Sequence, residues 1–191
     1  MSEPMIRGQV IAHTASFLRS QLDSSTARRL EDELSAELRI TLGEIVPALW
    51  YPRRYQVELL DALVTVKGKG EPAYADLVRC GAGFATVEND FTKLLMKILT
   101  TELFFKKLSR FWLRDHQNSG NFEVQALENI ERGVQLRLGD VAGYNHSAVL
   151  WLGWMQHVLQ RLSGPASHIE QTGWSWSNPG PNHVVYQVEW S

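Results

Sequence analysis

The side chains best suited to covalent chemistry are those of one cysteine, Cys80, and six histidines. A nucleophilic cysteine needs a nearby histidine and an electropositive pocket that stabilises its thiolate. No histidine is close to Cys80 in the sequence, and Gly81-Ala82-Gly83 lacks the Lys-Ser/Thr pair of a phosphate-binding loop. We therefore expect Cys80 to be a small packed residue rather than a nucleophile.

The histidines do not have the spacing of a metal site. His146 and His157 are eleven residues apart, so on one helix they would stand about 16 Å apart, too far for one metal ion. His168 and His183 could be neighbours on two paired strands, forming a pH-sensitive surface pair, but no acid or cysteine clearly accompanies them. We assign no role to these histidines. We expect no metal site, no cofactor, no catalytic residue and no enzymatic activity.

Aromatic residues form the first candidate binding set. Such residues usually build a core, and they also line the apolar pockets that bind small molecules. Trp151 and Trp154 are three apart on a predicted helix that already has an apolar stripe, so one of them is expected to face a pocket or a second subunit. The candidate ligand or interface residues are Trp50, Tyr51, Tyr55, Trp112, Trp151 and Trp154.

Basic residues form the second candidate set, on a stretch predicted to be an amphipathic helix. Several of them follow a spacing of four residues, which places them on one helix face. A solvated helix face is the interpretation that we favour, and a patch for an anionic partner is the alternative. The set comprises Lys93, Lys97, Lys106, Lys107, Arg110 and Arg114.

Composition limits the class of protein. The chain has 191 residues, 44% of them hydrophobic, and a net charge of −2. It therefore has no net positive charge that would attract nucleic acid. One cysteine excludes an internal disulfide. The N-terminus lacks the pattern of a signal peptide, and the longest near-apolar run, 147–155, is half of the roughly 20 residues of a membrane span. We expect a cytoplasmic protein without a membrane span.

Hydrophobic periodicity predicts an α+β fold. Helical spacing dominates residues 1–117, and Asp23 and Ser24 are placed to cap a helix there. The period then changes to two, with runs near 122–126 and 133–139 that are typical of an antiparallel hairpin. We expect a single domain, 1–191, whose helical N-terminal half packs on a C-terminal β-β-α-β-β unit, 118–191, with a four-stranded antiparallel sheet.

The end of the chain completes that unit. A helix is predicted over 144–162, and Gly164-Pro165 ends it. Two strands are predicted near 167–176 and 183–190, and the turn "SNPGPN" joins them in a hairpin that closes the sheet.

The order of several sequence segments resembles the order found in a known family. The chain is similar to uncharacterised proteins of this length that are expanded in myxobacteria. The similarity is carried by "LWYP" before a predicted helix, followed by "FFKKLSRFWLRDHQNSGNFEVQALE", "GVQLRLGD" and "VVYQVEW". More distantly the chain resembles the superfamily of 4-vinyl-reductase, haem nitric-oxide-binding and transport-particle (TRAPP) subunit domains. The resemblance spans nearly the whole chain. It implies a bacterial α+β signalling domain that binds a ligand or a partner and is not an enzyme.

The chain departs from this superfamily at its cofactor motifs. A haem sensor of the superfamily needs an axial histidine and a Tyr-x-Ser-x-Arg motif, and "YNHSAV" at 144–149 has the wrong spacing and no arginine. The cysteines that hold zinc in 4-vinyl-reductase domains are absent from the last two strands. The resemblance therefore implies neither haem nor zinc for this chain.

Three functions follow from these observations. Our main expectation is a non-catalytic protein-interaction, assembly or regulatory module that self-associates as a homodimer through exposed aromatic residues or a sheet edge. The alternative is a sensor that binds a small apolar ligand between the helical half and the sheet. An enzyme without a recognisable motif is the third.

Overall fold

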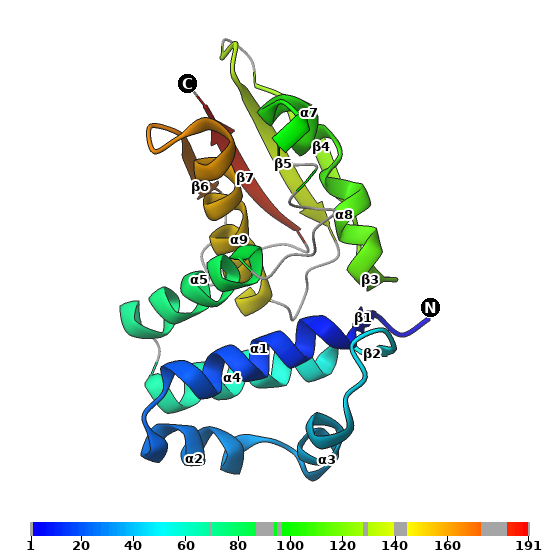
Figure 1. The fold of residues 1–191 in the computed structure, drawn as a ribbon, viewed down its shortest axis with the longest axis vertical. Coiled ribbons are helices and arrows are strands. Elements are labelled where there is room, and N and C mark those ends of the chain that lie inside the picture. The colour runs from blue at the N-terminus through cyan, green and yellow to red at the C-terminus, as the bar shows by residue number, and fades with distance from the viewer. Residues whose placement is uncertain are drawn as a thin grey trace.

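A computed structural model of the chain describes residues 2–68, 70–86, 94, 97–127, 130–139, 145–172 and 183–190. Its fold is α+β, with helices in the N-terminal part and an antiparallel sheet of four strands in the C-terminal part, as the sequence predicts (Figure 1). None of the described helices is both long enough and apolar enough to cross a membrane.

The N-terminal part contains five helices among the described residues. Local signals set several of their ends, since Asp23 accepts hydrogen bonds from the backbone N–H groups of Ser25 and Thr26, as a capping residue does. Ser35 caps the next helix in the same way. The helices are α1 (Gly8–Gln21), α2 (Ser24–Glu33), α3 (Ala36–Glu44), α4 (Arg54–Lys67) and α5 (Glu71–Thr86).

A small three-stranded sheet, not predicted from the sequence, ties the N-terminus to the middle of the chain. Strand β1 (Met5–Arg7) pairs antiparallel with both β2 (Trp50–Pro52) and β3 (His116–Gln117). Strands of two or three residues are too short to show an alternation of apolar and polar residues. Their pairing joins segments that are about 45 and about 110 residues apart in sequence, so only the folded chain reveals it.

The larger sheet has the strand order β4-β5-β7-β6. Its strands are β4 (Phe122–Ala126), β5 (Gly133–Gly139), β6 (His168–Thr172) and β7 (His183–Glu189), and every pair is antiparallel. Helix α9 (Asn145–Ser163) packs against this sheet, and the hydroxyl of Tyr186 on β7 donates a hydrogen bond to its Ala148 carbonyl, 2.9 Å away. The predicted hairpin and the predicted helix are therefore confirmed.

Two details of the last strands differ from the sequence-based expectation or cannot be compared with it. His168 and His183 are not neighbours, because in the observed register His168 is opposite Glu189 and His183 is opposite Gly139. The predicted turn "SNPGPN" and residues 173–176 of the predicted strand lie outside the described residues.

Helices α7 (Thr101–Lys106) and α8 (Leu108–Asp115) precede the large sheet in sequence and pack on it. Their buried side chains, among them Phe104, Phe105 and Trp112, belong to the same apolar cluster as the sheet and α9. The side chains of α1 to α5 mostly form a second cluster, to which α9 adds Val149 and Leu150. The core therefore has two parts, and α9 contributes to both.

Helices α5 and α9 connect the two clusters through an unusually close contact. A Cβ atom on Gly81 of α5 would collide with the backbone carbonyl of Leu150 on α9. A Cβ atom on Gly153 of α9 would in turn collide with the carbonyl of Val78 on α5. The two backbones can touch only because both positions are glycine.

We expect Gly153→Ala to lower the free energy of unfolding by about 1–3 kcal/mol or more, as overpacking of a closed contact does. Gly43→Ala on α3 is the matched control, because a Cβ atom there would meet nothing within 4 Å. This second change should be neutral or stabilise the helix by up to about 1 kcal/mol. Urea denaturation measures both values, and equal effects of the two substitutions would contradict the role of the close contact.

Candidate functional site

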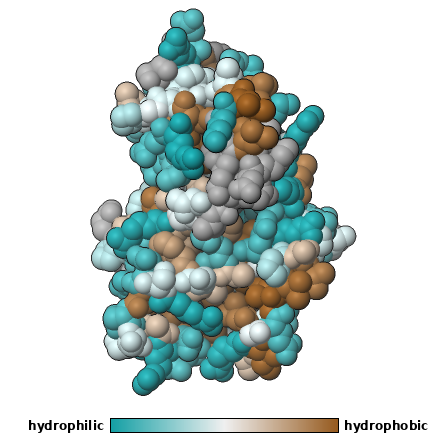
Figure 2. All heavy atoms as spheres, viewed as in Figure 1, coloured by the Kyte–Doolittle hydropathy of each residue, from teal (hydrophilic) through white to brown (hydrophobic). Residues whose placement is uncertain are grey.

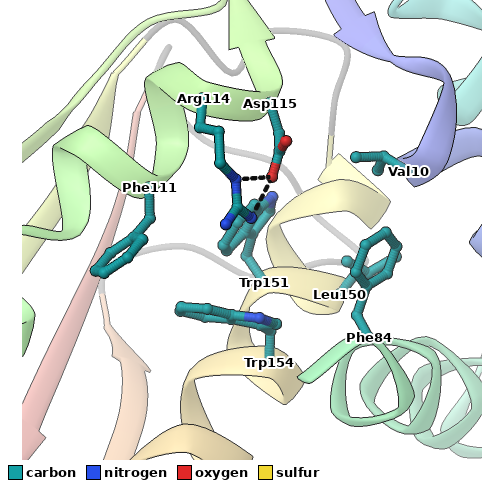
Figure 3. Close-up of a pocket in the computed structure, with 8 residues that line it drawn as sticks. All are labelled: Val10, Phe84, Phe111, Arg114, Asp115, Leu150, Trp151 and Trp154. Atoms are coloured by element: carbon teal, nitrogen blue, oxygen red, sulfur yellow. Dashed lines mark hydrogen bonds and ion pairs between the residues drawn. The ribbon is translucent and has the colours of Figure 1, made fainter. Parts of the chain in front are cut away.

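A small cavity lies where the two parts of the core meet (Figure 3). Residues from four helices line it: Val10 of α1, Phe84 of α5, Phe111, Arg114 and Asp115 of α8, and Leu150, Trp151 and Trp154 of α9. Its volume is about 20 Å³, which is close to the space that a single buried water needs. Any larger ligand therefore requires the lining side chains to move.

Helical spacing explains how the apolar walls are placed. Phe111 and Arg114 are three residues apart on α8, and Trp151 and Trp154 are three apart on α9, so each pair lies on one helix face. In Figure 3, Trp154 lies below Arg114, and Phe111 and Phe84 lie on opposite sides. The cavity is thus enclosed mainly by aromatic rings.

An ion pair forms the polar edge of the cavity. Arg114 donates to Asp115 Oδ2 from Nη2 at 2.6 Å and from Nε at 3.0 Å. The other carboxylate oxygen of Asp115 accepts from Gln9 Nε2 of α1 at 2.8 Å. Arg7 Nε donates to the carbonyl of Arg114, with 3.5 Å between the two atoms. The end of α8 is thereby fastened to β1 and α1, across the boundary between the two parts of the core.

A continuous series of aromatic contacts lies behind the cavity. The ring centroids of Trp112 and Trp151 are 5.1 Å apart, and those of Trp151 and Trp154 are also 5.1 Å apart. Trp154 stacks on Phe104 with a centroid distance of 6.1 Å. Aromatic pairs at such distances each contribute about 0.5–1.5 kcal/mol beyond the area that they bury. The wall of the cavity is therefore well packed.

His116 at the start of β3 is a buried histidine that the sequence analysis did not single out. Its ring lies flat on Trp112, with 3.7 Å between centroids, and its Nδ1 is 3.1 Å from the Trp112 carbonyl, to which it donates. Burial, and secondarily the positive charge of Arg53, lower the pKa of His116 well below its usual value. The imidazole is therefore neutral at pH 7, and its Nε2 has no hydrogen-bond partner among the described residues.

The structure separates the predicted aromatic set into two groups. Trp151 and Trp154 line the cavity, and Trp112 contacts Trp151 from behind. The other three lie elsewhere: Trp50 packs under the Arg7 guanidinium, Tyr51 accepts a hydrogen bond from Val46, and Tyr55 bonds to Glu37. Phe84 and Asp115 line the cavity without having been predicted, because nothing in the local sequence distinguishes them.

The predicted basic set lies mainly on α7 and α8. Lys106, Lys107 and Arg110 are on the outer side of these helices, whereas Arg114 reaches the cavity. Lys97 precedes α7 and is exposed, and Lys93 lies outside the described residues. Cys80 is fully buried, and burial raises its pKa to about 12, which is the behaviour of a packed residue.

No model of a known protein family matches the sequence, and no curated protein matches it either. Solved structures do match in fold. A variant of the H-NOX protein from K. algicida, in the Fe(II) unliganded state, has a TM-score of 0.70 and 12% identity, with 96% of each chain covered. An H-NOX protein from S. oneidensis has a TM-score of 0.60 and 16% identity, over 97% of this chain and 96% of that one.

A third H-NOX structure, from work on heme distortion in that family, has a TM-score of 0.66 and 8% identity, over 97% of this chain and 95% of that one. The chain therefore has the fold of H-NOX domains, so the predicted resemblance to haem nitric-oxide-binding domains is confirmed at the level of fold. The myxobacterial part of that resemblance stays a prediction.

The residues at the junction do not fit a haem. The cavity of about 20 Å³ is far below the roughly 300–1,000 Å³ of ordinary ligand pockets, and indole and phenyl rings occupy the space around it. Neither His116 nor His13 lines the cavity, because His116 is stacked on Trp112 and His13 contacts the far side of the wall at Phe84. The sequence also has no Tyr-x-Ser-x-Arg motif.

The expectation of an assembly module is wrong. It was based on exposed aromatic residues or a sheet edge that would support self-association, but Trp151 and Trp154 are 9% and 3% exposed and belong to the core. The solved structures that share the fold over nearly its whole length are H-NOX domains.

The neutral state of His116 generates a prediction for the pH dependence of stability. Because the folded-state pKa lies well below that of the unfolded chain, stability is retained above about pH 6.5 and lost as the pH falls below it. This group therefore lowers the free energy of unfolding progressively as the pH falls from 7 toward 5.

His116→Phe keeps a ring against Trp112 and should remove this part of the pH dependence. His13 and His157 also have lowered pKa values, because of burial, so a smaller slope should persist in the variant. Urea denaturation at a series of pH values measures the difference. An unchanged pH slope in the variant would contradict the buried neutral state of His116.

Proposed function

We propose that the chain is a sensor module that binds a small apolar ligand at the junction of α1, α5, α8 and α9, without haem and without catalysis. The observation that carries this proposal is the cavity itself, which has walls from both parts of the core. A ligand at a junction of this kind can change how the two parts pack, which is what a sensor requires. The H-NOX fold supports the same class of function by analogy.

The contacts around the cavity suggest how occupancy would be transmitted. A ligand larger than water must displace Arg114, Phe111 or an indole ring, because the free volume is so small. Arg114 and Asp115 are bonded to β1 and α1 through Arg7 and Gln9. Displacement of this ion pair would loosen the connection between α8 and the N-terminal helices, while the close α5–α9 contact keeps the two parts joined.

Native mass spectrometry of the protein purified from its own host tests the proposal. We expect an additional mass that disappears under denaturing conditions, and extraction then identifies the compound. A protein that carries no additional mass, and whose unfolding temperature none of a panel of small apolar compounds changes, would contradict ligand binding.

Two matched substitutions locate the binding site. Phe111 lines the cavity, and Phe105 is a buried phenylalanine of the neighbouring helix that does not. We expect Phe111→Leu to change the affinity for the identified compound at least about 10-fold, which corresponds to about 1.4 kcal/mol. Phe105→Leu should leave the affinity unchanged at a similar cost in stability. Calorimetric titration measures both, and equal affinities of the two variants would place the site elsewhere.

A further inference from the structure

The outer side of α7 and α8 carries an exposed stripe that the ligand site does not use. It consists of the exposed residues Leu103, Lys106, Arg110 and Leu113 and of the half-buried Lys107 between the two helices, and we call it the outer stripe. The spacing of three and four residues keeps these side chains on one face, although α7 ends at Lys106 and α8 begins at Leu108. Figure 2 shows hydrophobic and hydrophilic surface side by side where these helices lie in Figure 1.

Both ends of the outer stripe are exposed leucines. Leu103 on α7 is 41% exposed, and Leu113 on α8 is 54% exposed. Just before α7, Ile98 is 66% exposed. The interpretation favoured from the sequence, a solvated face, did not include exposed apolar side chains among the lysines. These exposed apolar side chains favour the alternative interpretation, a patch that binds an anionic partner.

The same segment is the most basic part of an acidic chain. Residues 93–114 contain six lysines and arginines and one acidic residue, Glu102, while the whole chain has a net charge of −2. Glu102 pairs with Lys106 at the surface. The positive charge is thus local to the segment, and it lies beside the exposed leucines.

This combination fits a lipid surface better than a protein or a nucleic acid. Protein interfaces are depleted in lysine and centred on aromatic residues, and single-stranded nucleic acids stack on aromatic rings. The aromatic residues of α7 and α8 all point inward, among them Phe104, Phe111 and Trp112. Leucines beside lysines and arginines on a helix are typical of segments that lie in the interface of an anionic bilayer.

We propose that the outer stripe docks the chain on a bilayer surface that carries anionic lipid headgroups. The leucines enter the boundary between headgroups and acyl chains, and Lys106, Lys107 and Arg110 contact the headgroups. Helix α8 then has two roles, because its inner face lines the cavity with Phe111. The docking is independent of the ligand proposal, since it depends only on the outer face.

Sedimentation of the full chain with vesicles tests this proposal. We expect binding to vesicles of phosphatidylcholine and phosphatidylglycerol in a ratio of three to one, little binding to phosphatidylcholine alone, and a loss of binding at high salt. The triple variant Lys106→Gln, Lys107→Gln and Arg110→Gln should bind about 100-fold more weakly, because each basic residue near such a surface contributes roughly fivefold. Leu103→Ser with Leu113→Ser should weaken binding roughly 10-fold.

The control is Arg39→Gln with Ile40→Ser on α3, since Ile40 is 66% exposed and follows an exposed arginine. This variant should bind like the unmodified chain, and thermal unfolding confirms that each variant is folded. Equal binding to both kinds of vesicle, or undiminished binding of either stripe variant, would overturn the proposal. Tighter binding to polyglutamate than to the anionic vesicles at an equal concentration of charge would also overturn it, in favour of an acidic protein partner.

Discussion

The contact between α5 and α9 is the constraint on which the rest of the structure depends. Gly81 and Gly153 let the two backbones touch, and α9 then serves both parts of the core at once. A helix pair held this closely fixes where Leu150, Trp151 and Trp154 face. The junction cavity therefore lies at a position defined by backbone contact rather than by adaptable side chains.

Aromatic packing then decides what the junction can hold. In a fold shared with H-NOX domains, the rings of Phe84, Phe111, Trp151 and Trp154 enclose a space of about 20 Å³. A closely packed aromatic wall is stable, and it also excludes a large planar cofactor. The fold thus supplies the location of the cavity, while the side chains determine that any ligand there is small or that the walls must open for it.

Helix α8 links the cavity, the boundary between the two parts of the core and the outer stripe. Its inner face contributes Phe111 and the ion pair of Arg114 with Asp115, and its outer face carries Arg110 and Leu113. The hydrogen bonds of Gln9 and Arg7 hold its C-terminal end to the N-terminal helices. A single short helix therefore contacts the candidate ligand site, the boundary between the two parts of the core and the solvent.

The sequence by itself determined the element types of the longer segments, because their periodicity and caps are local. Residues that are close together in the sequence predict the hairpin of β4 and β5, the helix α9 and the cap at Asp23. Tertiary structure alone decided the three-stranded sheet, the buried site of His116 and the cavity. These depend on pairs such as Gln9 with Asp115 and Ile6 with His116, which are about a hundred residues apart, and no local pattern records which distant side chains meet.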